Sequence, residues 1–313
     1  MGDVTHIVVT GATGFLGRQI VRQGLAAGHR LTAISRKAPD TDLGCKHLPM
    51  NLAKVDRGEL MQQIAGADAI IHAAGEMSSD LAVHARSTLP ATRTICKVAE
   101  KLDLHLVHVS SIAIYDYLAV GEGEFVTEAT RAETKPETRD GYVAAKLDQE
   151  HLVASFCPSA SVLRVGALFG PGRVWNAHLG TRIGPALIRL APNGQIPLCH
   201  VTRAAAAALQ AATRKISGAV NVVDADLPDR IRFLDAFEKS GWPRIIIPFP
   251  WQAMDRISGA LGFWKSRPGL LRRPVLHARI KPVGFDSSLL SASFPDLPNM
   301  QFESAMREAL KHG

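Results

Sequence analysis

Residues 7–17 read Ile-Val-Val-Thr-Gly-Ala-Thr-Gly-Phe-Leu-Gly, and this stretch decides the fold. An apolar strand, a glycine-rich turn and the start of an amphipathic helix follow one another here, which is the pattern of a dinucleotide-binding βα unit. Gly11 and Gly14 let the turn close tightly and bring backbone N–H groups toward a pyrophosphate, which the positive end of the helix dipole also attracts. Gly17 lets the helix pack close to the strand. Taken alone, such a loop is also compatible with an ordinary strand-to-helix turn.

The composition is that of a globular protein. Of 313 residues, 46% are hydrophobic and 21% are charged, which allows one large α/β domain or a nucleotide-binding domain with a smaller appendage. We find no run of about 18 apolar residues that could span a membrane, and we expect no cleaved signal peptide. The four cysteines are scattered without a C-x-x-C pair, which argues against a zinc site and a disulfide framework. We therefore expect a cytoplasmic protein that holds no metal.

Much of the net charge of +7 is concentrated in residues 265–281, which carry no carboxylate. A solvated basic face accounts for such a cluster, and so does contact with an anionic cofactor, a phosphorylated substrate or an acidic membrane surface. No nucleic-acid-binding motif accompanies it, so we expect no nucleic acid partner. The cations of this cluster are Lys265, Arg267, Arg272, Arg273, Arg279 and Lys281.

The end of the second predicted strand, about 20 residues after the glycine loop, decides between NAD and NADP. There the sequence reads Ser35-Arg36-Lys37, with no carboxylate at 34–37. An acidic residue would bind the ribose 2′-hydroxyl of NAD, whereas a hydroxyl followed by two cations suits the 2′-phosphate of NADP. We therefore expect NADP; the alternative is that the two cations are simply exposed after a strand.

Strands alternate with helices along the first 165 residues, which predicts a Rossmann-type α/β fold with a doubly wound parallel sheet. Residues 1–165 would form the dinucleotide-binding domain, and 166–313 mainly a smaller substrate-binding region interleaved with it. The small residues Ala73, Ala74 and Gly75, at the end of a predicted strand, let a flat ring approach the backbone. Outside the glycine unit, we expect strands at 30–34, 47–50, 67–72, 104–109, 161–165 and 219–223, helices at 56–65, 88–101, 141–156, 181–190, 202–213, 232–240 and 302–311, and a loop at 116–140.

Tyr142 and Lys146 are four residues apart on a predicted helix, so their side chains project from the same face. An ammonium group beside a phenol favours the phenolate, and we expect it to lower the pKa of Tyr142 from about 10 toward the range of an acid/base catalyst. Ser111 ends the fifth predicted strand and is placed to hydrogen-bond a reacting oxygen. The spacing Y-x-x-x-K is common by chance, but its occurrence after a glycine loop and a strand-end serine is much rarer.

With these motifs in order, the sequence resembles an extended short-chain dehydrogenase/reductase, a group that includes nucleotide-sugar epimerases, 3β-hydroxysteroid dehydrogenases and dihydroflavonol reductases. The G-x-x-G-x-x-G spacing, one residue off the general fingerprint, is the spacing of this family. The resemblance implies that Tyr142 exchanges a proton with the substrate oxygen, that Ser111 orients this oxygen, and that Lys146 also holds the nicotinamide ribose. It covers residues 10–17, 72–75, 109–115, 142–146 and 164–172.

The resemblance also implies which residues hold the cofactor, and it suggests a homodimer formed through the helices near Thr88 and Tyr142. Asn51 stands where the family often has an aspartate near the adenine, and Val165 and Phe169 replace the usual proline and tyrosine. The expected cofactor-binding residues are Gly11, Thr13, Gly14, Phe15, Leu16, Gly17, Ser35, Arg36, Lys37, Asn51, Leu52, Ala73, Ala74, Gly75 and Val165.

The leading expectation is an NADP-dependent oxidoreductase that acts on a carbonyl or secondary alcohol of a small, hydrophobic molecule. Residues 245–264 are unusually apolar and resemble the C-terminal parts of steroid-dehydrogenase-like members. This segment would contact a hydrophobic substrate, lie on a membrane surface, or pack internally.

Other activities of the family are less well supported. Ile112 and Ala113 stand in place of the Asp-Glu pair of sugar 4,6-dehydratases, which disfavours dehydration. A nucleotide-sugar epimerase is the second expectation, with Asn176, Arg203 and Arg230 available for a diphosphate. A non-catalytic NADP-binding regulator is the third.

Overall fold

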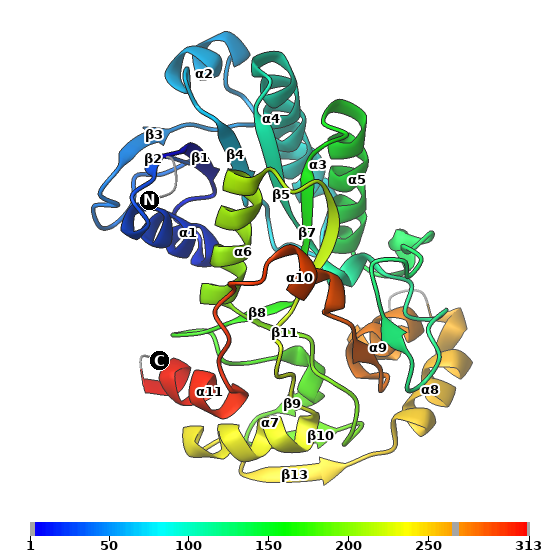
Figure 1. Cartoon of the computed structure of the whole chain (residues 1–313). Helices are drawn as coiled ribbons and strands as arrows, with labels where there is room; N and C mark the ends of the chain where they lie inside the picture. The colour runs from blue at the N-terminus through cyan, green and yellow to red at the C-terminus, as the bar shows by residue number, and fades with distance from the viewer. Residues whose placement is uncertain (1–3, 265–268, 312–313) are drawn as a thin grey trace.

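The computed structural model of the chain describes residues 4–264 and 269–311. Lys265 and Arg267, two cations of the expected basic cluster, lie outside the described residues. Seven parallel strands form a central sheet in the order β12-β7-β5-β4-β1-β2-β3 (Figure 1). They are β1 (His6–Thr10), β2 (Arg30–Ser35), β3 (Lys46–Pro49), β4 (Ala69–His72), β5 (His105–Ser111), β7 (Ser161–Val165) and β12 (Gly218–Val222).

Helices cover both faces of this sheet, so the predicted doubly wound α/β fold is confirmed. On one face lie α1 (Phe15–Ala26) and α6 (Val201–Arg214), and on the other lie α2 (Arg57–Gln63), α4 (Thr88–Leu102) and α5 (Gly141–Phe156). The short α3 (Leu81–Arg86), which the sequence did not predict, connects β4 to α4.

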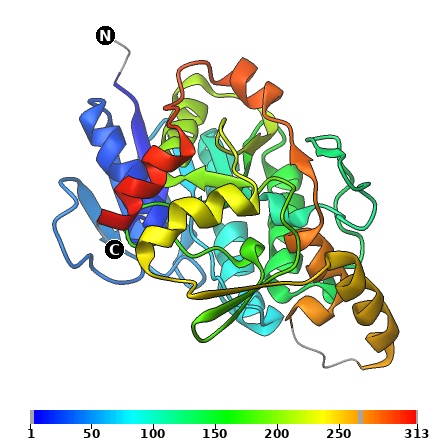
Figure 2. The same cartoon turned by 90° about the horizontal axis from the view of Figure 1, so that it is seen from below.

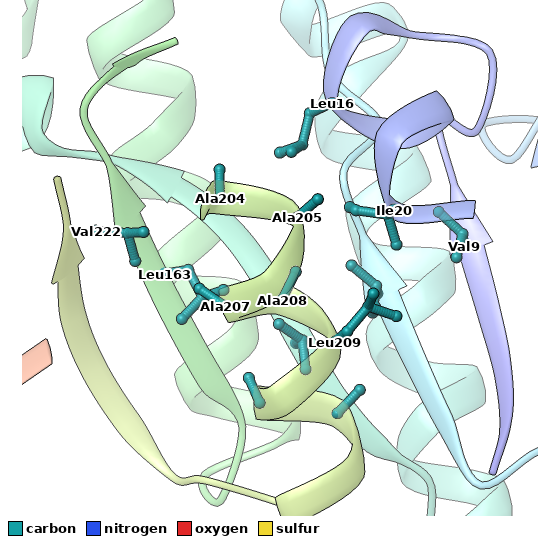
Figure 3. Close-up of a cluster of buried hydrophobic side chains, with 14 of the residues drawn as sticks. Val9, Leu16, Ile20, Leu163, Ala204, Ala205, Ala207, Ala208, Leu209 and Val222 are labelled. Carbon is teal, nitrogen blue, oxygen red and sulfur yellow. The ribbon is translucent and has the colours of Figure 1, made fainter. Parts of the chain in front are cut away.

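The face under α1 and α6 shows how the sequence fixes the packing (Figure 3). Four buried alanines of α6, at positions 204, 205, 207 and 208, lie between the sheet and α1. Their short side chains allow the helix to approach the strands closely, and Leu16 and Ile20 of α1 fill the remaining space. A larger side chain at these positions would overpack the core.

The remaining elements form a smaller region beyond the carboxyl ends of the strands (Figure 1). Because α6 and β12 return to the main sheet, this region is interleaved with it rather than separate in sequence. Its strands are β8 (Ala167–Phe169), β9 (Thr181–Ile183), β10 (Ala186–Arg189), β11 (Leu198–His200), β13 (Ile245–Pro248) and β14 (Gly284–Phe285), and its helices are α7 (Arg230–Phe237), α8 (Trp251–Ala260), α9 (Arg273–Ile280) and α11 (Phe302–Lys311). The short α10 (Ser288–Ser293) packs instead against β12 of the main sheet.

The helix predicted at 181–190 is wrong, because this segment is the antiparallel hairpin β9-β10. Gly184, with φ of +55°, and Pro185 form its turn, and both residues oppose a continuous helix. Thr181, Ile183 and Ile188 are β-branched and favour strands. The loop predicted at 116–140 is largely irregular, and its regular parts are the two-residue strand β6 (Phe125–Val126), paired to β14, and a 3-10 turn at Pro136–Thr138.

The apolar segment 245–264 lies partly on the surface. Ile245, Ile246 and Ile247 are 42–55% exposed on β13, an outer strand of the sheet β13-β10-β9. By contrast, Trp251 is buried, with its ring 5.6 Å from that of His277. In Figure 2, the gold helix α8 projects from the edge of the molecule. Internal packing therefore accounts for only part of this segment.

Candidate active site

A cleft of about 620 Å³ lies off the carboxyl ends of the central strands. Parallel sheets bind their ligands at this edge, where the chain crosses from one face to the other. The cleft walls come from the glycine loop, the ends of β4 and β5, the start of α5, residues 165–178 and α9. It therefore joins the two regions of the fold.

In the glycine loop, or glycine cradle, Gly11 and Gly17 lie so close to other backbone atoms that no side chain fits at these two positions. Gly11 has a φ of +68°, and a Cβ atom there would lie 2.9 Å from the backbone of Ala74. At Gly17 the added atom would lie 2.1 Å from the carbonyl oxygen of Gly11. The turn is closed by the N–H of Gly14, which donates to the same oxygen at 2.9 Å. Such a bare backbone at a helix start fits a dinucleotide pyrophosphate.

About half of the expected cofactor-binding residues line the cleft, and the others do not. Those in its wall are Gly11, Gly14, Phe15, Leu16, Gly17, Ala73, Gly75 and Val165. Those outside its wall are Thr13, Ser35, Arg36, Lys37, Asn51, Leu52 and Ala74.

Ser35 and Arg36, two of the residues expected to contact the 2′-position of the cofactor's ribose, already have hydrogen-bond partners. Ser35 is buried, and its hydroxyl donates to the carbonyl oxygen of Lys37 at 2.7 Å. Since that hydroxyl has one proton, His47 Nε2 donates to it, at 2.8 Å. Arg36 Nη1 pairs with Glu76 Oε1 at 2.8 Å, and Glu76 lines the cleft. The cation is therefore at the cleft rim.

The two residues expected near the adenine differ in burial. Asn51 is exposed, and its side-chain oxygen accepts from the backbone N–H of Ala53 at 3.1 Å. Leu52 is buried in the hydrophobic core under α2 and α4.

Ser111, Tyr142 and Lys146 meet in the wall of the cleft. Ser111 ends β5, its hydroxyl accepts from the backbone N–H of Ala113 at 3.2 Å, and it lies near enough to the Tyr142 phenol to lower the pKa of that group. Lys146 Nζ lies 5.9 Å from the centroid of the Tyr142 ring and donates to the carbonyl oxygen of Val109 at 2.8 Å. The side chain of Asp140 caps α5 by accepting from the N–H of Val143, which fixes the helix turn that carries Tyr142.

The expected lowering of the Tyr142 pKa by Lys146 is wrong. Burial raises the pKa of the phenol, and the nearby Ser111 hydroxyl and the charge of Arg173 oppose this rise only in part. Burial also lowers the pKa of Lys146 to about 8, against the favourable charge of Glu150. A buried phenol and a buried ammonium each favour their neutral form. Tyr142 therefore holds its proton at neutral pH.

Two of the three residues considered for a diphosphate have structural roles. Arg203 donates to the carbonyl oxygens of Val223 and Pro298, and Arg230 to those of His178, Asn193 and Arg279. Both guanidinium groups are buried outside the cleft wall. Their assignment to a diphosphate is therefore wrong, whereas Asn176 does line the cleft.

The far side of the cleft holds residues that the site motifs did not indicate, although one of them, Arg279, belongs to the basic cluster at 265–281. The polar ones come from the end of the 116–140 loop, from the segment after β8 and from α9, so only the fold brings them together. They are Arg139, Asp140, Arg173, His178 and Arg279, and apolar side chains of Ile112, Trp175, Val275 and Ala278 lie among them.

Two other kinds of site were sought in the described part of the chain. Over residues 4–264 and 269–311, no three His, Cys, Asp or Glu side chains gather as a metal site. Over the same residues, no helix has the length and apolar character needed to span a membrane.

Comparison with known proteins places this cleft in context. Residues 7–222 match the family described as NAD dependent epimerase/dehydratase. The chain is 26% identical over 225 residues to the ceramide reductase of Caulobacter vibrioides, covering 70% of this chain and 64% of that protein. It is 27% identical over 305 residues to a 4-hydroxy-2-methyl-3-oxo-4-farnesyl-3,4-dihydroquinoline-1-oxide ketoreductase of Stigmatella aurantiaca, covering 90% and 87%. The aligned part spans only 54% of a further relative, from Synechocystis.

Solved structures share the fold at lower identity. The UDP-N-acetylglucosamine 4-epimerase of Bacillus cereus superposes with a TM-score of 0.70 at 17% identity, covering 99% of this chain and 100% of that one. The UDP-glucuronic acid 4-epimerase of the same organism, in complex with NAD, superposes with a TM-score of 0.72 at 15% identity, covering 98% of each.

Proposed function

Because the chain belongs to the NAD dependent epimerase/dehydratase family, we propose that it is an NADP-dependent oxidoreductase acting on a carbonyl or secondary alcohol of a small, hydrophobic molecule. The observation that carries this proposal is the meeting of Ser111, Tyr142 and Lys146 in one cleft with the glycine cradle. The nicotinamide, when bound, supplies or accepts the hydride.

In the reducing direction, Tyr142 gives its phenolic proton to the substrate oxygen. Its raised pKa keeps that proton in place at neutral pH, so the group is a general acid rather than a phenolate. Ser111, whose hydroxyl lies beside the phenol, orients the same oxygen and stabilises its developing charge. Lys146 ties α5 to β5 through the carbonyl oxygen of Val109 and supplies positive charge beside the phenol ring.

NADP preference is supported by charge at the end of β2. Arg36 and Lys37 are exposed there, and no carboxylate of β2 competes for the ribose. The carboxylate that does approach Arg36 is Glu76, from the end of β4. A 2′-phosphate would take its place by offering the guanidinium a more highly charged partner.

A hydrophobic substrate is supported by the cleft and by the relatives. Ile112, Trp175, Val275 and Ala278 line the far side of the cleft. Two relatives are named as reductases of a ceramide and of a farnesylated quinoline oxide, both carrying long apolar groups. A nucleotide-sugar epimerase is the second candidate, supported by the epimerases that share the fold, but Arg203 and Arg230 are not available for its diphosphate.

We further propose a cytoplasmic homodimer, formed through α4 and α5, that touches a membrane surface through residues 245–264. The exposed isoleucines of β13 and Phe263, which is 82% exposed, support the membrane contact. Exposed apolar side chains in a group mark an interaction surface. Sedimentation of the purified protein with phospholipid vesicles would test the contact, and its sedimentation velocity alone would test the dimer.

A substrate screen at the nicotinamide absorbance tests the reaction. Hydrophobic ketones and nucleotide sugars are offered side by side, with NADPH and with NADH. We expect NADPH to be consumed with ketones, and nucleotide sugars to remain unchanged. Isomerised sugar without net change in the cofactor would instead establish the epimerase. Tight NADPH binding with no turnover of either class would favour the regulator.

A further inference from the structure

We propose that Arg139 and Arg279 form a subsite for an oxyanion, a carboxylate or a phosphate, on the substrate side of the cleft. This proposal rests on the proposed function, because it assigns a charged group to the substrate of that site. The substrate would then be amphipathic, with its reacting carbonyl at Tyr142 and an anionic group farther along the cleft.

Arg139 reaches the subsite from the turn before α5. Its side chain is 5% exposed and yet lines the cleft together with Tyr142. One donor of the guanidinium reaches the carbonyl oxygen of Tyr115 at 3.3 Å, and the group lies 5.9 Å from the centroid of the Tyr117 ring. The Nε–H of Arg139 is buried without a partner. A buried donor left unpaired is costly, and a ligand oxygen would satisfy it.

Arg279 reaches the subsite from α9, an element that is distant from Arg139 in the sequence. It is half-buried in the cleft wall, and burial lowers the pKa of its guanidinium. Among residues 4–264 and 269–311, no carboxylate lies within ion-pair distance of Arg279 or of Arg139. A buried and a half-buried cation that share a cleft, with no carboxylate of the described residues in ion-pair distance, form a site that favours an anion.

The carboxylates closest to these arginines are already engaged. Asp140 raises the pKa of both guanidinium groups, but its carboxylate accepts the backbone N–H of Val143. Glu133 acts on Arg139 in the same direction, and its carboxylate accepts the N–H of Lys135. Neither carboxylate lies within ion-pair distance of the two guanidinium groups, so each acts on them only as a more distant counter-charge.

A third guanidinium holds this arrangement in place. Arg230 is 1% exposed and donates to the carbonyl oxygens of Arg279 at 2.9 Å and His178 at 2.7 Å, both residues of the cleft wall. The pKa of His178 is lowered to about 3, by burial first and then by the charges of Arg230, Arg279 and Arg139. The neutral imidazole cannot serve as a cation, so the arginines carry the positive charge of this wall.

The position separates this subsite from the cofactor's phosphates. The glycine loop would hold those phosphates, and Arg173 lies beside this loop, 5.6 Å from the Phe15 ring. Arg139 and Arg279 line the wall formed by α9 and the turn before α5. A planar guanidinium fork matches carboxylate and phosphate oxygens, and two forks can hold one such group.

The test uses the full chain saturated with NADP⁺, so that the cofactor's own phosphate sites are filled. Inorganic phosphate and, separately, butyrate are titrated by calorimetry at constant ionic strength. We expect saturable binding of at least one, and binding at least tenfold weaker in Arg279→Gln. Arg256→Gln, an exposed arginine of α8 outside the cleft wall, is the matched control and should bind as the wild type does.

The two anions distinguish a phosphate from a carboxylate, because the anion that binds more tightly identifies the anionic group of the substrate. Arg139→Gln should weaken binding likewise, and Arg279→Gln keeps the test decisive should the buried Arg139 variant fail to fold. Absence of saturable binding to the NADP⁺-loaded protein, or unchanged binding in Arg279→Gln, would overturn the subsite. Because this measurement needs no turnover, a failed ketone screen overturns the proposed reaction without touching this result.

Discussion

The guanidinium of Arg36 lies 2.8 Å from the carboxylate of Glu76, joining the carboxyl ends of β2 and β4 across β1. The cation that would contact the 2′-phosphate is thus held at the rim of the cleft by a carboxylate. We predict that Arg36→Ala weakens NADPH binding about 10- to 100-fold, the value of one charged hydrogen bond. NADH binding should change little. Fluorescence titration with both cofactors measures this, and an equal loss for the two would refute the role of Arg36.

Removing the competing carboxylate should have the opposite effect. Glu76→Gln frees Arg36 from an exposed ion pair, and such pairs contribute about 0.2–1 kcal/mol. We therefore expect NADPH to bind up to about fivefold more tightly, with a smaller change for NADH. In the double variant with Arg36→Ala, this gain should vanish. A gain that persists there would mean that Glu76 repels the phosphate directly.

The acid role of Tyr142 predicts a loss of rate without a loss of cofactor. Tyr142→Phe removes the proton donor and should lower kcat about 10²- to 10⁴-fold, the usual contribution of a general acid. NADPH affinity should stay near that of the wild type, because the glycine cradle is untouched. Steady-state kinetics and titration together check this. Turnover at the wild-type rate would remove Tyr142 from the mechanism.

Burial of Lys146 predicts a stability that depends on pH. Its pKa is about 8 in the folded protein and about 10.4 in an unfolded chain. Between these values the unfolded chain binds more protons, so the free energy of unfolding rises with pH across this window. At pH 7 the buried charge costs about 3 kcal/mol, offset in part by the hydrogen bond to Val109.

Lys146→Met should therefore raise the free energy of unfolding by about 1–2 kcal/mol at pH 7 while abolishing turnover. Urea unfolding of the cofactor-free proteins measures the difference. The wild type should approach the variant in stability between pH 8 and 10, as its ammonium loses the proton. If the difference in the free energy of unfolding between the two proteins stays constant with pH, the charge of Lys146 is not the cause of that difference.

The glycine cradle predicts a severe effect of one methyl group. At Gly17 the added Cβ would lie 2.1 Å from the Gly11 oxygen, and the neighbour is backbone that cannot turn away. Gly17→Ala should therefore lose NADPH binding and several kcal/mol of stability. Gly259→Ala, in α8, meets no atom within 4 Å and should stabilise by about 0.5–1 kcal/mol. Thermal unfolding of both variants tests the contrast.

The sheet and its helices could be predicted because their signals are local. The apolar run before Gly11, the alanines of α6 and the Asp140 cap before α5 each act over a few residues. The error at 181–190 arose from apolar residues that suit a helix or a strand alike, and the Gly184-Pro185 turn decides between them. The spacing of Tyr142 and Lys146 and the strand-end position of Ser111 also made these residues candidates, and the structure brings them into one cleft.

The substrate side could not be predicted, because its residues are brought together only by the tertiary fold. Arg139 and Arg279 belong to no common motif and are distant in sequence. Burial likewise decided the pKa of Tyr142, and burial depends on the elements that surround the phenol. The four-residue spacing correctly indicated that Lys146 lies near Tyr142. It could not show that desolvation of the phenol affects its pKa more than the charge of Lys146 does.

Arg230 also joins parts of the chain that are synthesised at different times. Its guanidinium ties together carbonyl groups 52, 37 and 49 residues away in the chain, at His178, Asn193 and Arg279. The seven-stranded sheet is complete once β12 has left the ribosome, whereas the wall that carries Arg279 must wait for α9. Since chains fold from the N-terminal end as they emerge, the growing protein acquires its place for the dinucleotide before its place for the substrate.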